Sequence, residues 1–308
     1  MSLAMPRITA RRQALAYLEL TKPRIVTLVV ITGVPALLIA GHGWPEPRVF
    51  LGTLLGTVLA ASSAASFNMY FDRDIDALMR RTATRPLPAG ILPPSSALGL
   101  GFVLAGLSWM VLLLCANFLA AAIGLASIFY YAVVYTVWLK RRTPQNIVIG
   151  GGAGASAPLI AWAAVTGHVS VPALLLSSIV FLWTPPHFWA LALYRCEDYA
   201  HAHVPMLPVT HGESETRRQI LLYSLVLVPV TLSLVPLGVA GPAYLVPAAL
   251  LGGAFLFYAG RLHRRPSVPN AVRLFRFSIL YLFLLYVSLT VDAVLAIALP
   301  GARGHGAG

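Results

Sequence analysis

Long apolar stretches recur from one end of the chain to the other, and short polar segments separate them. A helix that crosses a membrane needs roughly 20 mostly apolar residues, because each residue adds about 1.5 Å and the hydrocarbon core is about 30 Å thick. Nine stretches reach this length: 24–43, 48–70, 96–114, 118–138, 146–166, 172–193, 219–238, 242–260 and 273–299. The pattern predicts an all-α polytopic membrane protein with nine transmembrane helices and a single membrane domain over residues 1–308.

Composition supports this class. Of the 308 residues, 58% are hydrophobic and 10% are charged, whereas about a quarter of the residues in a soluble domain are charged. The arginines before the first apolar stretch imitate a signal peptide, but eight further stretches follow, and we interpret the first as a retained helix. We expect residues 1–23 to be a cytoplasmic N-terminal segment, residues 300–308 to be a disordered tail, and a bacterial inner membrane to hold the protein.

The basic residues predict the orientation in the membrane. Of the 22 Lys and Arg residues, 20 fall in the N-terminal segment or near the loops that follow the second, fourth, sixth and eighth stretches, and only Arg48 and Arg303 lie on the other side. Because cytoplasmic loops are enriched in Lys and Arg, the N-terminus is expected in the cytoplasm and the C-terminus in the periplasm. The net charge of +12 then reflects topology, and no nucleic-acid partner is expected.

Acidic residues are scarce, yet three of the ten lie in the segment NMYFDRDIDALMRR, residues 68–81. Asn68, Asp72 and Asp76 are spaced by four, so in a continuous helix they stack on one face about 6 Å apart, whereas Asp74 points away. Carboxylates placed this way repel one another unless cations lie between them, and Mg²⁺ commonly joins carboxylates to substrate phosphates. The spacing indicates a metal–phosphate site; the alternative is a solvated helix end with mutually compensating charges.

A second acidic cluster follows the sixth stretch as the first follows the second stretch. It is the segment RCEDY at Arg195–Tyr199. The offset of four helices indicates two pseudo-equivalent halves whose acidic ends face each other.

Five ordered motifs resemble a known family. NMYFDRDID, followed by RRTATRPLPAG, is similar to the first Asp-rich motif of the UbiA superfamily of membrane prenyltransferases. Three further stretches narrow the resemblance to the haem-modifying branch, the protohaem IX farnesyltransferases or haem O synthases: YTVWLKRRTPQNIVIGGGAGASAPLIAWAAVTG, WTPPHFWALAL and EDYAHAHVPMLPV. The resemblance extends from LTKPRI at Leu20–Ile25 to about the start of the seventh stretch, and more loosely to the end.

The resemblance implies a reaction and a fold. This branch transfers a farnesyl group from farnesyl diphosphate to a vinyl group of haem B, with addition of water, and yields haem O and diphosphate. It depends on Mg²⁺ and is built from nine transmembrane helices around a central cavity open to the lipid bilayer. A haem A synthase or an oxidase-assembly protein is the candidate protein partner.

The resemblance also assigns site residues. Asn68, Asp72 and Asp76 match the first metal–diphosphate motif, and Asp198 matches the leading acid of the second. Metal ligation is thereby assigned to Asp72, Asp76 and Asp198. Ala202 stands where most of the superfamily has a second Asp, in agreement with the DYxxA pattern of the haem branch, and His203 stands where that branch often has Gly. The basic positions that match those holding the diphosphate are Arg81, Arg85 and Lys140.

His187, in the motif WTPPHFW, is the one histidine placed well inside a span. Such histidines usually face the protein interior. Two interpretations remain open: His187 hydrogen-bonds a carbonyl freed by Pro185 and Pro186, or it contacts haem through the iron or a propionate. The resemblance favours the haem contact. Asp292, near the opposite face, is interpreted as a packing residue.

Three other functions are alternatives. A different UbiA-type aromatic prenyltransferase, making quinone or chlorophyll precursors, would keep the acids but would not bind haem. A transporter would carry charged groups near the middle of the membrane, whereas these acids cluster at one face. A non-catalytic haem-binding protein would bind haem without requiring Mg²⁺.

Overall fold

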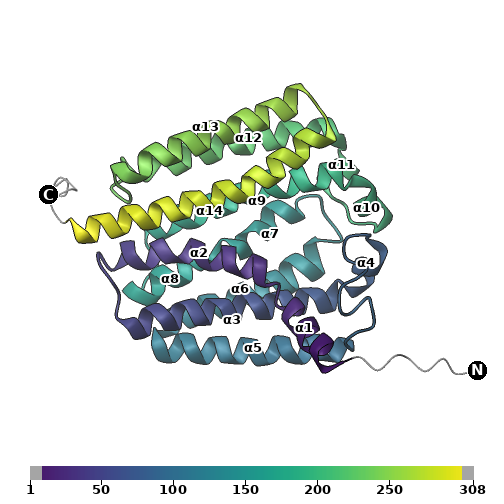
Figure 1. Ribbon diagram of the computed structural model, residues 1–308, viewed down its shortest axis with the longest axis horizontal. Coiled ribbons are helices and arrows are strands. Elements are labelled where there is room, and N and C mark those ends of the chain that lie inside the picture. The colour runs from purple at the N-terminus through teal and green to yellow at the C-terminus, as the bar shows by residue number, and fades with distance from the viewer. Residues whose placement is uncertain (1–8, 300–308) are drawn as a thin grey trace, which may run out of the picture.

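A computed structural model describes residues 9–299, which form helices joined by turns and contain no strand (Figure 1). The helices of the first half are α1 (Ala10–Leu20), α2 (Pro23–Ala40), α3 (Pro47–Phe71), α4 (Arg73–Leu78), α5 (Pro94–Cys115), α6 (Phe118–Phe129) and the π-helix η1 (Tyr130–Leu139). The second half comprises α7 (Asn146–Gly154), α8 (Ser156–Thr166), α9 (Val171–Tyr194), α10 (Cys196–His201), α11 (Leu207–Thr210), α12 (Gly212–Ser233), α13 (Pro242–Arg264) and α14 (Val268–Ala298).

Eight helical segments among the described residues are long and apolar enough to cross a membrane. They are α2, α3, α5, α6 with η1, α7 with α8, α9, α13 and α14. The ninth expected span, 219–238, corresponds to α12, whose first two turns carry Glu213, Glu215, Arg217 and Arg218. These charges explain why α12 does not qualify by apolar composition. The all-α polytopic membrane class is confirmed, and a ninth crossing by α12 is compatible with it.

Several boundaries differ from the expected ones for local reasons. α12 ends at Ser233 rather than at residue 238, and turns follow it. α14 begins at Val268, five residues before the expected start, because the Ser267 hydroxyl caps it by accepting a hydrogen bond from the Asn270 amide at 3.4 Å. The expected span 146–166 is interrupted at Ala155, whose carbonyl accepts a hydrogen bond from Ser177 of α9 at 2.6 Å.

Close contact between α3 and α5 organises the N-terminal half. Gly56 of α3 and Gly101 of α5 leave room for Leu112 and Phe67, respectively, since an added Cβ would lie 2.5–2.9 Å from their side-chain atoms. Two buried serines bind the glycine carbonyls reciprocally: Ser63 donates to Gly101 at 2.7 Å, and Ser108 donates to Gly56 at 2.8 Å. Small residues and interhelical hydrogen bonds are the features that hold membrane helices together.

The C-terminal half is packed around α9 and α14. Large side chains fill this core, and buried tyrosines direct their hydroxyls to helix carbonyls: Tyr286 donates to Leu176 at 2.6 Å, and Tyr244 donates to Thr231 at 3.0 Å. Asp292 is buried and accepts a hydrogen bond from the Gly241 amide at 2.7 Å. This contact fits the packing role expected for Asp292.

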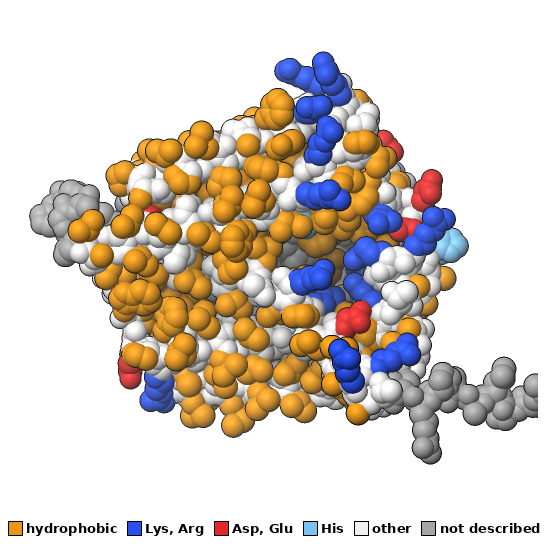
Figure 2. All heavy atoms as spheres, viewed as in Figure 1, with side chains coloured by type: hydrophobic (Ala, Val, Ile, Leu, Met, Phe, Trp, Pro, Cys, Tyr) orange, Lys and Arg blue, Asp and Glu red, His pale blue; other side chains and the backbone are white. Residues whose placement is uncertain are grey.

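The molecule has two chemically different ends. Figure 1 places α1, α4, α10 and α11 at one end of the bundle and the C-terminal end of α14 at the other. Figure 2 shows Lys and Arg side chains gathered at the first end, around a hollow, while hydrophobic side chains cover most of the remaining face. The molecule is therefore a multi-pass membrane protein with one polar end, which is hollowed.

Candidate functional site

The first acidic segment lies where α3 passes into α4. Helical hydrogen bonding continues through this junction, from the Asp72 amide to the Asn68 carbonyl at 2.9 Å and from the Asp76 amide to the Asp72 carbonyl at 2.7 Å. Asn68, Asp72 and Asp76 are therefore all buried on the inner side. Asp74 faces outward with its side chain 62% exposed, and it binds Arg141 at 2.7 Å, which lowers the pKa of the Asp74 carboxyl. The expected stack on one helix face is confirmed.

Each inward-facing group of this segment binds a cation from another part of the chain. Lys140, directly after η1, donates to Asp72 at 2.5 Å, and Arg85, in the loop after α4, donates to Asp76 at 2.6 Å. Lys22, between α1 and α2, donates to the Asn68 side-chain carbonyl at 2.5 Å. Three separate segments thus bring positive charge onto one face of α3 and α4.

The electrostatics of this cluster favour an added anion. Burial and the neighbouring Arg85 lower the pKa of Lys22 to about 7, against the opposing effect of Asp72. Burial also acts to lower the pKa of Lys140, but the Asp72 carboxylate outweighs it, so the pKa of Lys140 is raised. Lys22, Arg85 and Lys140 together oppose only two carboxylates, and a bound anion would relieve this excess of positive charge.

Lys22 is a candidate site residue that the sequence interpretation missed. No local pattern links Lys22 to Asn68, which lies 46 positions further along the chain. Its backbone is in the left-handed region, with φ of 51°, at the N-cap of α2 and directly before Pro23. The one feature of the sequence that could have indicated Lys22 is its place in LTKPRI, where the resemblance to the UbiA superfamily begins.

The second acidic segment repeats the local design of the first. α9 ends at Tyr194, and α10, a helix of six residues like α4, follows it. Asp198 lies 3.7 Å from Arg195, with its side chain 12% exposed. Ile75 and Met79, in and directly after α4, share a hydrophobic cluster with Tyr199 and Ala202, from the α10 segment. The two acidic ends therefore meet at the same end of the bundle, as the sequence predicted.

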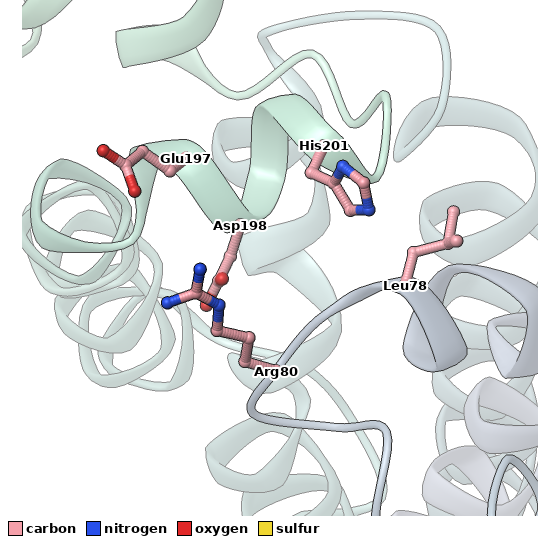
Figure 3. Close-up of a pocket in the computed structure, with 5 residues that line it drawn as sticks. All are labelled: Leu78, Arg80, Glu197, Asp198 and His201. Carbon is pink, nitrogen blue, oxygen red and sulfur yellow. The ribbon is translucent and has the colours of Figure 1, made fainter.

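A pocket of about 360 Å³ lies between these two segments, lined by Leu78, Arg80, Glu197, Asp198 and His201. In the close-up, Arg80 and Asp198 point toward one another and Glu197 points away (Figure 3). Arg81, the next residue after Arg80, is exposed and makes no hydrogen bond or ion pair with any residue in 9–299. Its guanidinium is available to an incoming ligand.

His203 lies just after α10 with a φ of 52°, in the left-handed region. Glycine adopts this region without the steric cost that other residues incur. The backbone at His203 is therefore one that glycine, the residue that the resemblance expects here, adopts readily.

The carboxylates fit a divalent cation in their chemistry. Within residues 9–299, no three His, Cys, Asp or Glu side chains form a group ready to hold a metal ion, and cations neutralise the acids instead. However, Oδ1 of Asp72 is buried without a hydrogen-bond partner among the described residues, and Oδ2 of Asp198 has only the 3.7 Å contact with Arg195. Buried polar atoms are rarely left unpaired, and carboxylate oxygens are the ligands that Mg²⁺ prefers.

His187 lies in α9, which stays helical through Pro185 and Pro186. Its Nδ1 lies 2.7 Å from the Ser278 hydroxyl of α14, rather than next to a carbonyl freed by the prolines. Its ring stacks on Trp183 and on Phe275, with centroid distances of 4.3 and 4.8 Å. The expected hydrogen bond of His187 to a carbonyl freed by the prolines is therefore wrong in its partner. The partner is the Ser278 hydroxyl of α14.

Comparison with known proteins gives consistent matches. A sequence model of the UbiA prenyltransferase family matches residues 29–296. A protoheme IX farnesyltransferase of Gloeobacter violaceus is 50% identical over 296 residues, covering 96% of each chain. One of Azorhizobium caulinodans is 50% identical over 282 residues, covering 90% of this chain and 92% of the relative. One of Roseiflexus sp. (strain RS-1) is also 50% identical, over 278 residues, but this chain spans about half of its length, 52%.

Solved structures share the fold at lower identity. A digeranylgeranylglyceryl phosphate synthase superposes with a TM-score of 0.76 at 20% identity, covering 93% of this chain and 99% of that one. A UbiA homolog from Archaeoglobus fulgidus, solved with DMAPP and Mg²⁺, superposes with a TM-score of 0.65 at 18% identity, covering 92% and 99%. These similarities establish the arrangement of the helices.

Proposed function

This chain belongs to the UbiA prenyltransferase family, and from that premise we propose that it transfers the farnesyl group of farnesyl diphosphate to a vinyl group of haem B. The products are haem O and diphosphate. The relatives that carry the name protoheme IX farnesyltransferase support this acceptor. The observation that carries the proposal is the cluster of half-buried Lys22, Arg85 and Lys140 around the buried carboxylates of Asp72 and Asp76, which has the positive charge that a diphosphate needs.

The first step breaks the allylic C–O bond, and the diphosphate leaves with the electron pair. Lys22, Arg81, Arg85 and Lys140 hold the diphosphate oxygens and stabilise the charge that develops there. Asp72, Asp76 and Asp198 would hold Mg²⁺, which would supply further positive charge at the same leaving group. Asn68 orients this assembly through its bonds to Lys22, at 2.5 Å, and to Asp72, at 2.7 Å.

In the second step, the vinyl group attacks the allylic cation and a C–C bond forms. Positive charge then lies on the carbon next to the porphyrin ring, where water adds and releases a proton, leaving a hydroxyl group. Early entry of water would instead hydrolyse farnesyl diphosphate, so the reaction needs an apolar, shielded site. Trp183 and Phe275 hold the imidazole of His187 between them, and His187 supplies a ligand for the haem iron.

The proposal includes an orientation. The end that carries α4 and α10 faces the cytoplasm of a bacterial inner membrane, with the N-terminus on the same side and the C-terminus in the periplasm. Farnesyl diphosphate enters this end with its polar group at the membrane surface and its chain among apolar side chains. A haem A synthase or an oxidase-assembly protein is the proposed recipient of haem O.

The test is an assay of the purified protein in lipid nanodiscs with haem B, farnesyl diphosphate and Mg²⁺, with the products separated by mass. We expect farnesylated haem that carries one added water, and no product after chelation of Mg²⁺. An aromatic acid or quinone precursor serves as the competing acceptor. Alkylation of that acceptor, with haem B left unmodified, would assign the protein to a different branch of the family.

A further inference from the structure

The hydrogen bonds of Ser278 determine which nitrogen of His187 carries the proton. The Ser278 hydroxyl has two close neighbours: Nδ1 of His187 at 2.7 Å and the backbone carbonyl of Phe275, three residues earlier in α14, also at 2.7 Å. A serine hydroxyl carries a single proton, so it donates to only one of them.

The Phe275 carbonyl is the group that accepts the hydrogen bond of the Ser278 hydroxyl. A carbonyl oxygen only accepts, so the short contact with the Phe275 carbonyl requires the Ser278 hydroxyl to donate there. Toward His187 the same hydroxyl can then only accept, and Nδ1 of the imidazole must carry the proton. A neutral imidazole has one N–H. Nε2 is therefore the nitrogen with a free lone pair.

The surrounding contacts hold this arrangement in place. Trp183 donates from Nε1 to the Ser278 carbonyl at 2.7 Å, which ties α9 to α14 at this level. The imidazole is nearly parallel to Trp183 and Phe275, with interplanar angles of 17° and 25°. Nε2 makes no hydrogen bond with any residue in 9–299. The ring is thus fixed by its neighbours and by Nδ1, and Nε2 remains for a ligand.

We propose that Ser278 is a positioning residue of the acceptor site: it holds His187 as the Nδ1–H tautomer and thereby directs the Nε2 lone pair to the iron of the haem substrate. This inference rests on the proposed function, which supplies haem as the ligand. Histidines that bind metals usually donate their second N–H to a fixed acceptor, and loss of that acceptor typically weakens metal affinity by about 10- to 100-fold. Ser278 occupies the position of that acceptor.

The test compares four variants of the full-length protein in nanodiscs. Ser278→Ala removes the acceptor, Ser278→Thr keeps the hydroxyl, and His187→Ala removes the ligand. Ser288→Ala is the matched control, because Ser288 makes the same bond to a carbonyl three residues earlier in α14, at 2.8 Å to Leu285, and forms no hydrogen bond with a histidine of residues 9–299. Ferric haem B is titrated into each protein and followed by absorption and electron paramagnetic resonance, and stabilisation by Mg²⁺ and farnesyl diphosphate reports intact folding.

We expect His187→Ala to lose the signature of histidine-ligated haem and Ser278→Ala to bind haem about 10- to 100-fold more weakly. Its histidine-ligated signal should also decrease. Ser278→Thr and Ser288→Ala should resemble the wild type, and all variants should keep their stabilisation by farnesyl diphosphate.

Two results would overturn the inference. One is wild-type haem affinity and spectrum in Ser278→Ala; the other is a Thr variant as weak as the Ala variant although its response to farnesyl diphosphate is intact, which would assign the effect to packing. Failure of the proposed function has a different signature. The wild type would then form no farnesylated haem, whatever Ser278 does to haem binding.

Discussion

Asp72 and Asp76 are buried carboxylates, and each is paired with a cation: Asp72 with Lys140, 68 residues away, and Asp76 with Arg85, in the loop after α4. A buried charge without a partner is strongly destabilising, so these pairs preserve the site in the absence of substrate. The pairing leaves one oxygen of Asp72 without a partner. At the scale of single residues, the site is therefore organised for ligands but incompletely satisfied.

Replacement of an inward-facing acid should abolish catalysis without preventing folding. For Asp76→Asn we expect turnover to fall by at least about 10²–10³-fold, since the variant loses charge that organises the leaving-group site, while its level in membranes stays near that of the wild type. Asp74→Asn is the matched control, because Asp74 lies two residues away and faces outward. Product formation by Asp76→Asn at the rate of the control would dismiss the metal–diphosphate role.

Lys22 should contribute to diphosphate binding although no sequence motif marks it as a ligand. Lys22→Met keeps a long unbranched side chain and removes its charge. Loss of a charge-assisted hydrogen bond costs about 1.5–3 kcal/mol. We expect the KM for farnesyl diphosphate to rise about 10- to 100-fold, with the KM for haem B little changed. Arg24→Met, at an exposed position of the same segment, should leave both values unchanged; an equal effect in both variants would indicate a general electrostatic origin.

At the scale of elements, the C-terminal ends of α3 and η1 lie side by side and are joined by polar contacts. Asn68 and Asp72 of the α3 junction contact Thr136 and Lys140, respectively, at 3.1 and 2.5 Å. Both pairs of residues are four apart, so the two segments run side by side with their polar groups in register. η1 is a π-helix, and such segments are frequent at functional sites. Its geometry brings Thr136 and Lys140 to the same side.

The close approach of α3 and α5 predicts a stability difference between two glycines of α5. A Cβ at Gly101 would lie 2.7–2.9 Å from the ring of Phe67, next to Asn68, whereas a Cβ at Gly106 meets nothing within 4 Å. We expect Gly101→Ala to destabilise the protein by about 1–3 kcal/mol through overpacking and Gly106→Ala to be neutral or slightly stabilising. Thermal unfolding in detergent measures both, and equal midpoints for the two variants would refute the close approach.

At the scale of the whole molecule, charge and hydrophobicity are separated along the bundle. Basic side chains gather around the hollow at one end (Figure 2), and α4 and α10 meet at that same end (Figure 1). The basic residues that orient the protein therefore also surround the proposed diphosphate site. Topology and substrate binding use the same positive charge.

Cysteine labelling tests the orientation. In a variant without the free thiols of Cys115 and Cys196, His168→Cys and His263→Cys place single cysteines at exposed positions in the loop between α8 and α9 and near the end of α13. A maleimide that cannot cross membranes should label His168→Cys in intact spheroplasts and His263→Cys only after permeabilisation. The reverse pattern would invert the proposed topology.

Features that depend on local periodicity and length follow from the amino-acid sequence alone. Apolar stretches of membrane-spanning length identified the helical membrane class, and the spacing of Asn68, Asp72 and Asp76 placed them on one helix face. Both follow from the constant rise and turn of a helix. Helix boundaries differ from the predicted ones where a cap or an interruption sets them, as at Ser267 and Ala155.

Contacts between residues far apart in the chain depend on how the helices pack. Lys22 and Asn68 are 46 residues apart, Lys140 and Asp72 are 68 apart, and His187 and Ser278 are 91 apart. No helical period relates such positions, because their contact depends on how whole helices pack and on the rotation of each helix about its axis. The placement of the acids on one helix face is thus set locally. The contacts that Lys22 and Lys140 make with this face, and the tautomer of His187, depend on how the helices pack.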